Sequence, residues 1–318
     1  MLHVWFPEGV GQLKNIKGAL ILLVAALIWG MAFVAQSSAA DSIGPFTFNA
    51  LRSFVGALFL LAFLAVRTAS SKKAEPSPEP TTGKRLWLGG GLCGVALFVA
   101  VNFQQLGLTV YPDGIASSGR AGFITATYVV MVALCSCFFG KKLHPLVLIS
   151  TVGCLAGMYF LCLSGGFSGI YLGDLFLLLC AVCFAAHIMI VDRFSSLDCI
   201  RLSCIQFLTC GVLSGVAMLL FEQPDLHAIL AAWLPILYTG IFSSGVAYTL
   251  QMIGQKYAEP AVASIVMSLE SVFSALAGWV LLHEVLSPRE LLGCALVFAA
   301  VILAQVPEFL KKKQTAGE

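Results

Sequence analysis

One acidic residue lies inside a long apolar stretch near the end of the chain. The stretch SIVMSLESVFSALAGWVLL covers residues 264–282, and Glu270 is its only charged residue. An ionised acid in hydrocarbon costs roughly 2.5–3.5 kcal/mol on insertion scales, so such residues are rare and are functional candidates. We expect Glu270 to bind a substrate amine or to exchange a proton. A structural ion pair or a hydrogen-bonded helix contact is the alternative.

Two arginines are the cations inside apolar stretches. Arg120 lies in ASSGRAGFITATYVVM, where small residues allow a neighbouring helix to approach closely. Thr127 and Tyr128 follow at i+7 and i+8 and share a helical face with it. Arg120 with Tyr128 is therefore expected to hold a carboxylate in a cavity wall through charge-assisted hydrogen bonds. For Arg52 we favour a structural role, and either arginine has a side chain long enough to reach the membrane surface.

Further polar and aromatic residues fall within apolar stretches. Four are expected to shape a substrate pocket or to take part in coupling: Trp29, Asn102, His187 and Tyr248. Packing and interhelical hydrogen bonds, worth up to about 2 kcal/mol each, are the alternatives. Three more are assigned to structure together with Arg52: Gln105, Gln206 and Glu284. Glu284 is expected in a loop, as an acid that caps a neighbouring helix.

The sequence has none of the motifs that would indicate an enzyme. It has no HExxH, no GxSxG with triad partners and no GxxxxGK[ST] phosphate-binding loop. Cys180 and Cys183 with His187 give too few ligands for a tetrahedral metal site. The eleven cysteines lie mostly in apolar runs, where cysteine behaves as a small hydrophobic residue. We expect no catalytic residue, no cofactor and no metal.

The elements that position these residues are membrane-spanning helices. Of the 318 residues, 59% are hydrophobic and only 11% are charged, against about 25% charged in soluble domains. The apolar residues recur in runs of the length that crosses about 30 Å of hydrocarbon as a helix. Ten spans are predicted: 18–36, 46–66, 86–108, 114–139, 145–163, 170–191, 199–221, 228–252, 260–282 and 287–306. The fold class is an all-α polytopic membrane protein.

The basic residues predict the orientation of these spans. With the N-terminus inside, fifteen of the eighteen Lys and Arg residues fall in cytoplasmic segments, and the outer loops hold Arg289 alone. This asymmetry follows the positive-inside rule. We therefore expect the protein in the cell membrane, with both termini on the cytoplasmic side. The organisation is a cytoplasmic segment at 1–17, two halves at 18–164 and 165–307, and a basic tail at 308–318. A polar linker covers 67–85.

The two halves resemble each other. GALILLVAALIWGMAFV from Gly18 corresponds to GDLFLLLCAVCFAAHIM from Gly173, and VYPDGIASSGRAGF corresponds to KYAEPAVASIVMS. Because each half has an odd number of spans, the second half must be inverted relative to the first. Inverted repeats are a common architecture of transporters, with the substrate near the midplane between the halves.

Several segments resemble the EamA-type members of the drug/metabolite transporter superfamily. They are LIWGMAFVAQ with IGPFTFNALRSFVGALFL, then SSGRAGFITATYVVMV, and finally LHEVLSPRELLGCALVFAAVILAQ. The resemblance covers about residues 18–305. It implies ten helices in two inverted five-helix repeats, a central cavity and alternating access. Family members typically export amino acids, other metabolites or toxic compounds, and some import.

We therefore predict a secondary transporter, an exporter of small metabolites such as amino acids or amines. The expected partners are a small-molecule substrate and the lipid bilayer, with no nucleic acid; protons as coupling ion and a homodimer are compatible with the sequence. The alternatives are a passive channel or facilitator, and a membrane receptor or scaffold without transport.

Overall fold

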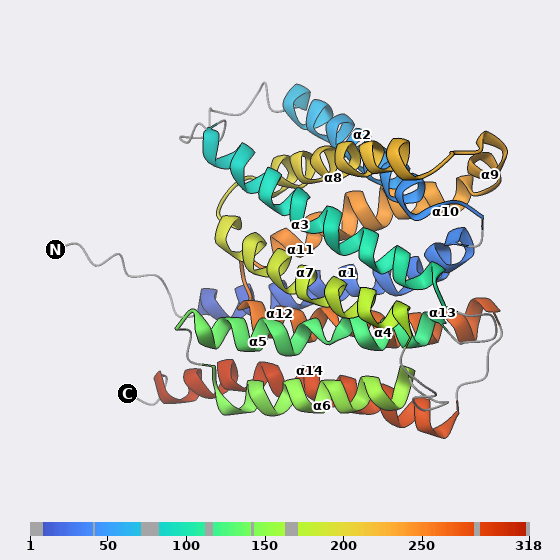
Figure 1. Cartoon of the computed structure of the whole chain (residues 1–318). Helices are drawn as coiled ribbons and strands as arrows, with labels where there is room; N and C mark the ends of the chain where they lie inside the picture. Colours follow the sequence, from blue (N-terminus) through green and yellow to red (C-terminus); the bar gives the residue numbers. More distant parts are fainter. Residues whose placement is uncertain are drawn as a thin grey trace.

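The secondary structure of the described residues is entirely helical (Figure 1). The computed structural model describes residues 9–40, 42–70, 83–111, 117–140, 143–162, 171–282 and 287–315. The first part of the chain forms α1 (Gly9–Ala40), α2 (Pro45–Ser70), α3 (Lys84–Thr109), α4 (Ser117–Ala126), α5 (Tyr128–Phe138) and α6 (Pro145–Cys162). The second part forms α7 (Leu172–Phe194), α8 (Cys199–Phe221), α9 (Leu226–Ala231), α10 (Trp233–Tyr238), the π-helix η2 (Thr239–Ala247), α11 (Tyr248–Gly254), α12 (Pro260–Met267), α13 (Leu269–Leu282) and α14 (Pro288–Thr315).

Eight helical stretches among these residues are long and apolar enough to cross a membrane. The expectation of an all-helical, polytopic membrane protein is therefore confirmed. Each of the ten predicted spans overlaps one helix or a run of consecutive helices. The number of membrane crossings, the inverted repeat and the sides on which the termini lie remain predictions.

Three predicted spans are interrupted where the sequence suggested continuous helices. The fourth breaks at Thr127 between α4 and α5, and the ninth breaks at Ser268 between α12 and α13. At each break a hydroxyl donates to a carbonyl one turn back: Thr127 Oγ1 to Ile124 O and Ser268 Oγ to Ile265 O, both at 2.6 Å. Such bonds satisfy backbone groups that water cannot reach in a membrane. The eighth span contains η2, and π-helical turns are frequent at functional sites.

The helices pack as two groups with α1 and α7 between them (Figure 1). At one edge α6 lies along α14, with α4, α5, α12 and α13 next to this pair. At the other edge α2 lies along α8, with α3 and η2 packed against them. Because α1 contacts η2, α11, α12 and α13, and α7 contacts α3, α4 and α5, both helices touch the two groups.

Two acidic residues fasten the ends of the α2–α8 pair. Glu222, after the last residue of α8, accepts hydrogen bonds from the backbone amides of Phe46 and Thr47 at 2.8 Å each, and from Thr47 Oγ1 at 2.6 Å. These amides belong to the first turn of α2, where backbone N–H groups have no partner within the helix. The end of α8 thereby caps the beginning of α2.

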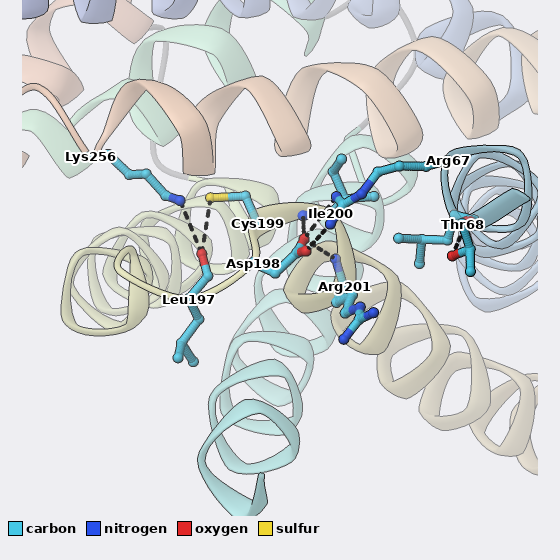
Figure 2. Close-up of polar contacts among 9 residues, drawn as sticks. Arg67, Thr68, Leu197, Asp198, Cys199, Ile200, Arg201 and Lys256 are labelled. Atoms are coloured by element: carbon cyan, nitrogen blue, oxygen red, sulfur yellow. Dashed lines mark hydrogen bonds and ion pairs between the residues drawn. The ribbon is translucent and has the colours of Figure 1, made fainter. Parts of the chain in front are cut away.

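Asp198 has the corresponding position at the opposite end of the pair (Figure 2). It caps α8 by accepting from the amides of Ile200 and Arg201 at 3.1 and 3.2 Å, and it forms an ion pair with Arg67 near the end of α2. Burial alone would raise the pKa of Asp198. The hydrogen bond from Arg67 and the two backbone hydrogen bonds outweigh burial, so the pKa lies below its ordinary value.

Two helix crossings depend on pairs of glycines. A Cβ atom at Gly173 in α7 would lie 2.8 Å from the carbonyl oxygen of Gly107 in α3. A Cβ atom at Gly18 in α1 would lie 3.1 Å from the carbonyl oxygen of Gly254 in α11. Small residues let helix backbones approach closely in membranes. Both crossings therefore depend on the absence of a side chain.

Candidate functional site

A cavity lies in the middle of the protein, between the two helix groups. Its wall takes residues from α1, α2, α3, α4, α5, α7, η2, α11, α12 and α13. It leaves about 50 Å³ for the centres of water-sized molecules, which is room for roughly three to five waters. The cavity is therefore small, and helices from both parts of the chain enclose it.

Five residues predicted to bind substrate or take part in coupling lie in this wall: Trp29, Tyr128, His187, Tyr248 and Glu270. They come from separate helices and are as far apart in the sequence as residues 29 and 270. The helix breaks help to bring them together, because Tyr128 begins α5 and Glu270 is the second residue of α13.

Glu270 is a buried acid whose side chain is 9% exposed. Tyr128 donates a hydrogen bond from its hydroxyl to Glu270 Oε1 at 3.4 Å. No described basic side chain lies within 4 Å of the carboxylate. An acid buried without a cation is costly. The carboxylate is thus available to a group that enters the cavity.

Arg52 also lies in the cavity wall, although the sequence suggested a structural role for it. Its side chain is 4% exposed, and Nη1 donates to Gln36 Oε1 at 3.3 Å. The guanidinium also lies 5.5 Å from the centre of the Phe48 ring. Among the described side chains no carboxylate is within 4 Å. Arg52 has five N–H donors, so it can bind an anion in addition to Gln36.

Aromatic rings form the wall between these two charges. Tyr248 meets Trp29 edge-to-face with ring centroids 4.8 Å apart, and it meets His187 at 5.9 Å. Tyr248 is also within electrostatic range of both Arg52 and Glu270. The wall therefore offers a guanidinium, a carboxyl group and aromatic surface to one bound molecule.

Four other predicted residues are not in the described cavity wall. Asn102 is buried between helices, where it accepts from Asn49 Nδ2 at 3.0 Å and donates to Ser214 Oγ at 3.1 Å. Gln105 donates to the carbonyl oxygen of Gln36 at 3.4 Å. The side chain of Arg120 and the whole of Glu284 lie outside the described residues.

Gln206 also lies outside the cavity wall, but it contacts His187 in that wall. Gln206 Oε1 is 2.8 Å from His187 Nε2. The structural role predicted for Gln206 is consistent with this bond, which fixes the orientation of the imidazole ring.

The sequence reasoning missed several residues of the wall. They are uncharged: Phe33, Gln36, Thr125, Phe184 and Ser243. One signal was available, because Trp29, Phe33 and Gln36 follow the i, i+4, i+7 spacing of one helical face. Ser243 belongs to η2, which no periodicity in the sequence indicates. Among the described residues no group of three His, Cys, Asp and Glu side chains could hold a metal ion.

An all-helical membrane protein whose spans surround a central polar cavity has the architecture of a multi-pass membrane transporter. The family model of the EamA-like transporter family matches the chain twice, over residues 16–163 and 171–305. The chain belongs to this family.

Three relatives are similar to the chain over most of its length. An uncharacterized transporter of Archaeoglobus fulgidus is 32% identical over 304 residues, which are 94% of this chain and 89% of the relative. The uncharacterized inner membrane transporter YedA of Escherichia coli is 26% identical and covers 94% of this chain and 93% of its own. The aromatic amino acid exporter YddG of Ancylobacter novellus is 27% identical, covering 91% and 96%.

A solved crystal structure has the same fold. It superposes with a TM-score of 0.75 at 24% sequence identity, covering 92% of this chain and 97% of its own.

Proposed function

We propose that the protein is a secondary transporter that exports small metabolites, with amino acids or amines as the leading class, by alternating access. One observation supports this most strongly: one cavity is lined by both Arg52 and Glu270, each buried without a described partner of opposite charge. Buried charges left unpaired are destabilising. A substrate with an ammonium group and a carboxylate would pair with both.

In this proposal Glu270 binds the substrate amine or exchanges a proton, as the sequence suggested. Arg52 takes the carboxylate-binding role that the sequence gave to Arg120, because Arg52 is the arginine whose described side chain lines the cavity. Charge-assisted hydrogen bonds to a guanidinium are roughly twice as strong as neutral ones. Tyr128 then orients the Glu270 carboxylate through its hydroxyl.

The size of the cavity supports a mechanism that requires helix movement. Space for a few water molecules is less than an amino acid needs, so the two helix groups must separate to admit one. Alternating access by rocking of one bundle against the other provides such a movement. The wall would change shape most easily at the helix breaks at Thr127 and Ser268 and at η2. The regular α-helical hydrogen bonds are already interrupted at these places, so a movement there would break few of them.

Matched contacts support two inverted five-helix repeats. The pair Gly107–Gly173 corresponds to Gly254–Gly18, since each joins the third span of one half to the first span of the other. The bond between Asn49 and Asn102 likewise corresponds to that between Ser203 and Thr249. The family model also matches once in each half. With the basic residues placed inside, both termini are cytoplasmic and the chain lies in the cell membrane.

Amino acids are favoured among small metabolites by the exporter of Ancylobacter novellus, which is named for aromatic amino acids. The aromatic wall of Trp29 and Tyr248 suits a side chain of that kind.

Flux through the purified protein in proteoliposomes tests the proposal. We would measure counterflow of labelled amino acids and amines, with and without a pH gradient, for the wild type and Glu270→Gln. Glu259→Gln is the matched control, because Glu259 is exposed just before α12. Saturable flux that Glu270→Gln abolishes and Glu259→Gln preserves is expected.

Other results would support a different class of protein. Unchanged flux in Glu270→Gln would remove the acid from the mechanism. Non-saturating flux would indicate a channel, and no flux of any compound would favour a receptor or scaffold.

A further inference from the structure

The described cavity wall contains buried polar atoms with no hydrogen-bond partner: the donor Trp29 Nε1, the hydroxyl of Thr125, and two atoms that can accept, His187 Nδ1 and Gln251 Oε1. His187 and Gln251 are 1% and 2% exposed, and both line the cavity. His187 Nδ1 and Gln251 Oε1 have no hydrogen-bond partner among the residues that the structure describes. Buried polar atoms are nearly always satisfied by protein or water, so these two atoms indicate what the cavity holds.

Gln206 determines which nitrogen of His187 is the acceptor. A carbonyl oxygen only accepts, so with Gln206 Oε1 facing His187 Nε2 at 2.8 Å the proton belongs on Nε2; the flipped amide would place it on Nδ1. No described carboxylate lies within 4 Å of the ring, and a buried unpaired charge is costly, which favours the neutral imidazole. A neutral ring with its proton on Nε2 leaves Nδ1 as an acceptor.

The two acceptors lie on adjoining helices next to one aromatic ring. Tyr248 packs against His187 at 5.9 Å between centroids, and Gln251 follows Tyr248 at i+3 on the same face of α11. Gln255 Nε2 also donates to the carbonyl oxygen of Ile188 at 3.0 Å, which fixes the end of α11 against α7. The acceptors therefore belong to one region of the wall, which we call the α7–α11 face: His187, Tyr248 and Gln251.

We propose that the substrate bears a hydrogen-bond donor, a hydroxyl or an N–H group, on the part that lies against the α7–α11 face, and that His187 and Gln251 select for it. This rests on the proposed function and refines its substrate class. The donor is additional to the ammonium and carboxylate groups that pair with Glu270 and Arg52.

The physical basis is the satisfaction of these acceptors by substrate. Each acceptor atom has less than 1 Å² open to a water-sized molecule in this structure, so neither is satisfied until the cavity widens. A substrate that then lies against this face without donating a hydrogen bond leaves both acceptors unpaired and loses affinity. Sites built around buried polar groups reject analogues that lack the matching donor, in the extreme by 10⁴-fold or more. Here the acceptors are neutral, and we expect at least about tenfold weaker binding of the analogue.

Binding to the purified protein in detergent, measured by calorimetry and thermal stabilisation, tests this. The probes are pairs that differ by one hydroxyl: tyrosine with phenylalanine, and tyramine with phenethylamine. Wild type is expected to bind the hydroxyl-bearing member of a pair at least tenfold more tightly. Gln251→Met, which keeps the length of the side chain but removes the acceptor, is expected to reduce that preference to about threefold or less.

Gln105→Met is the matched control. It makes the same change at an equally buried glutamine that also has an unpartnered Oε1 but lies outside the cavity wall. It is expected to keep the preference. His187→Phe should lose the preference as Gln251→Met does. If that variant does not fold, ¹⁵N shifts of the wild-type imidazole provide the second test, and a proton on Nδ1 would overturn the proposal.

The outcomes separate this inference from the proposed function. If both members of each pair bind equally and flux is intact, the inference is overturned and the proposed transport function is unaffected. A preference that depends on Gln251, without flux of any probe, would support the inference and contradict transport. Failure of every probe to bind at millimolar concentration would also overturn the inference.

Discussion

Replacing Arg52 by methionine separates a substrate-binding role from a structural one. The guanidinium is buried with one hydrogen bond to Gln36 and a ring contact with Phe48, and has no carboxylate within 4 Å among the described residues. If Arg52 binds substrate, Arg52→Met should fold well and lose binding of carboxylate-bearing compounds. If Arg52 only holds helices together, the variant should lose stability instead.

The expected magnitudes follow from these contacts. Losing the hydrogen bond to Gln36 costs about 1.5–3 kcal/mol, and losing the contact with Phe48 costs about 0.5–2 kcal/mol. Removing a buried, unpaired charge offsets this by several kcal/mol. The net change in the free energy of unfolding should lie within about 2 kcal/mol of zero. Binding of a carboxylate should weaken by about 2–5 kcal/mol, or roughly 30- to 4,000-fold.

The assay combines thermal unfolding in detergent with ligand titration on the same preparation. Arg193→Met is the matched control, because Arg193 is exposed near the end of α7, and it should leave affinity unchanged. Decarboxylated probes should bind Arg52→Met and wild type equally. A large loss of stability with unchanged affinity for carboxylates would refute the reasoning and return Arg52 to the structural role that the sequence suggested.

Three further predictions concern the scaffold. Asp198→Ala should lower the free energy of unfolding by about 0.5–2 kcal/mol through the lost cap. The pKa of Asp198 is lowered from 3.8 in the folded chain, so the stability that its carboxylate contributes is fully present above pH 3.8 and is lost as the pH falls through the lowered pKa. In Asp198→Asn the acid limb of a plot of Tm against pH should therefore flatten. Glu222→Ala should cost about 1.5–3 kcal/mol, since charged hydrogen bonds to α2 are lost, and unchanged thermal stability would contradict this cap. Gly173→Ala should cost about 1–3 kcal/mol by overpacking against Gly107, whereas Gly91→Ala, in open space, should not, as thermal unfolding would measure.

The sequence was sufficient to predict the helical membrane fold but not the interruptions within its helices. Hydropathy and length locate the spans, because a helix must cover the hydrocarbon thickness. The breaks at Thr127 and Ser268 depend on single hydroxyls that bond to carbonyls one turn back, and such hydroxyls are also common in unbroken helices. The π-helix η2 packs against α1 and α2, which are distant in the sequence, and no local pattern indicates it.

The cavity was predictable where a residue was conspicuous in its span. Glu270, His187 and Trp29 stand out against apolar neighbours, and all three line the cavity. Arg52 was assigned to structure because depth along a helix does not tell which way a side chain points. Asn102 lies outside the described cavity wall, and its buried amide bonds to Asn49 and Ser214, which is the interhelical contact given as the alternative.

The basic and the acidic residue of the cavity wall, Arg52 and Glu270, come from different halves of the chain. In the register that matches Asn49 with Ser203, Arg52 corresponds to Gln206, and in the register that matches Tyr111 with Tyr257, Glu270 corresponds to Ile124. Under the proposed inverted repeat, two identical half-length chains would present the same side chain at both symmetric positions, and so would face like charges or none. A dipolar cavity on this proposal therefore requires that the two copies have diverged in sequence, whether or not they are joined in one chain.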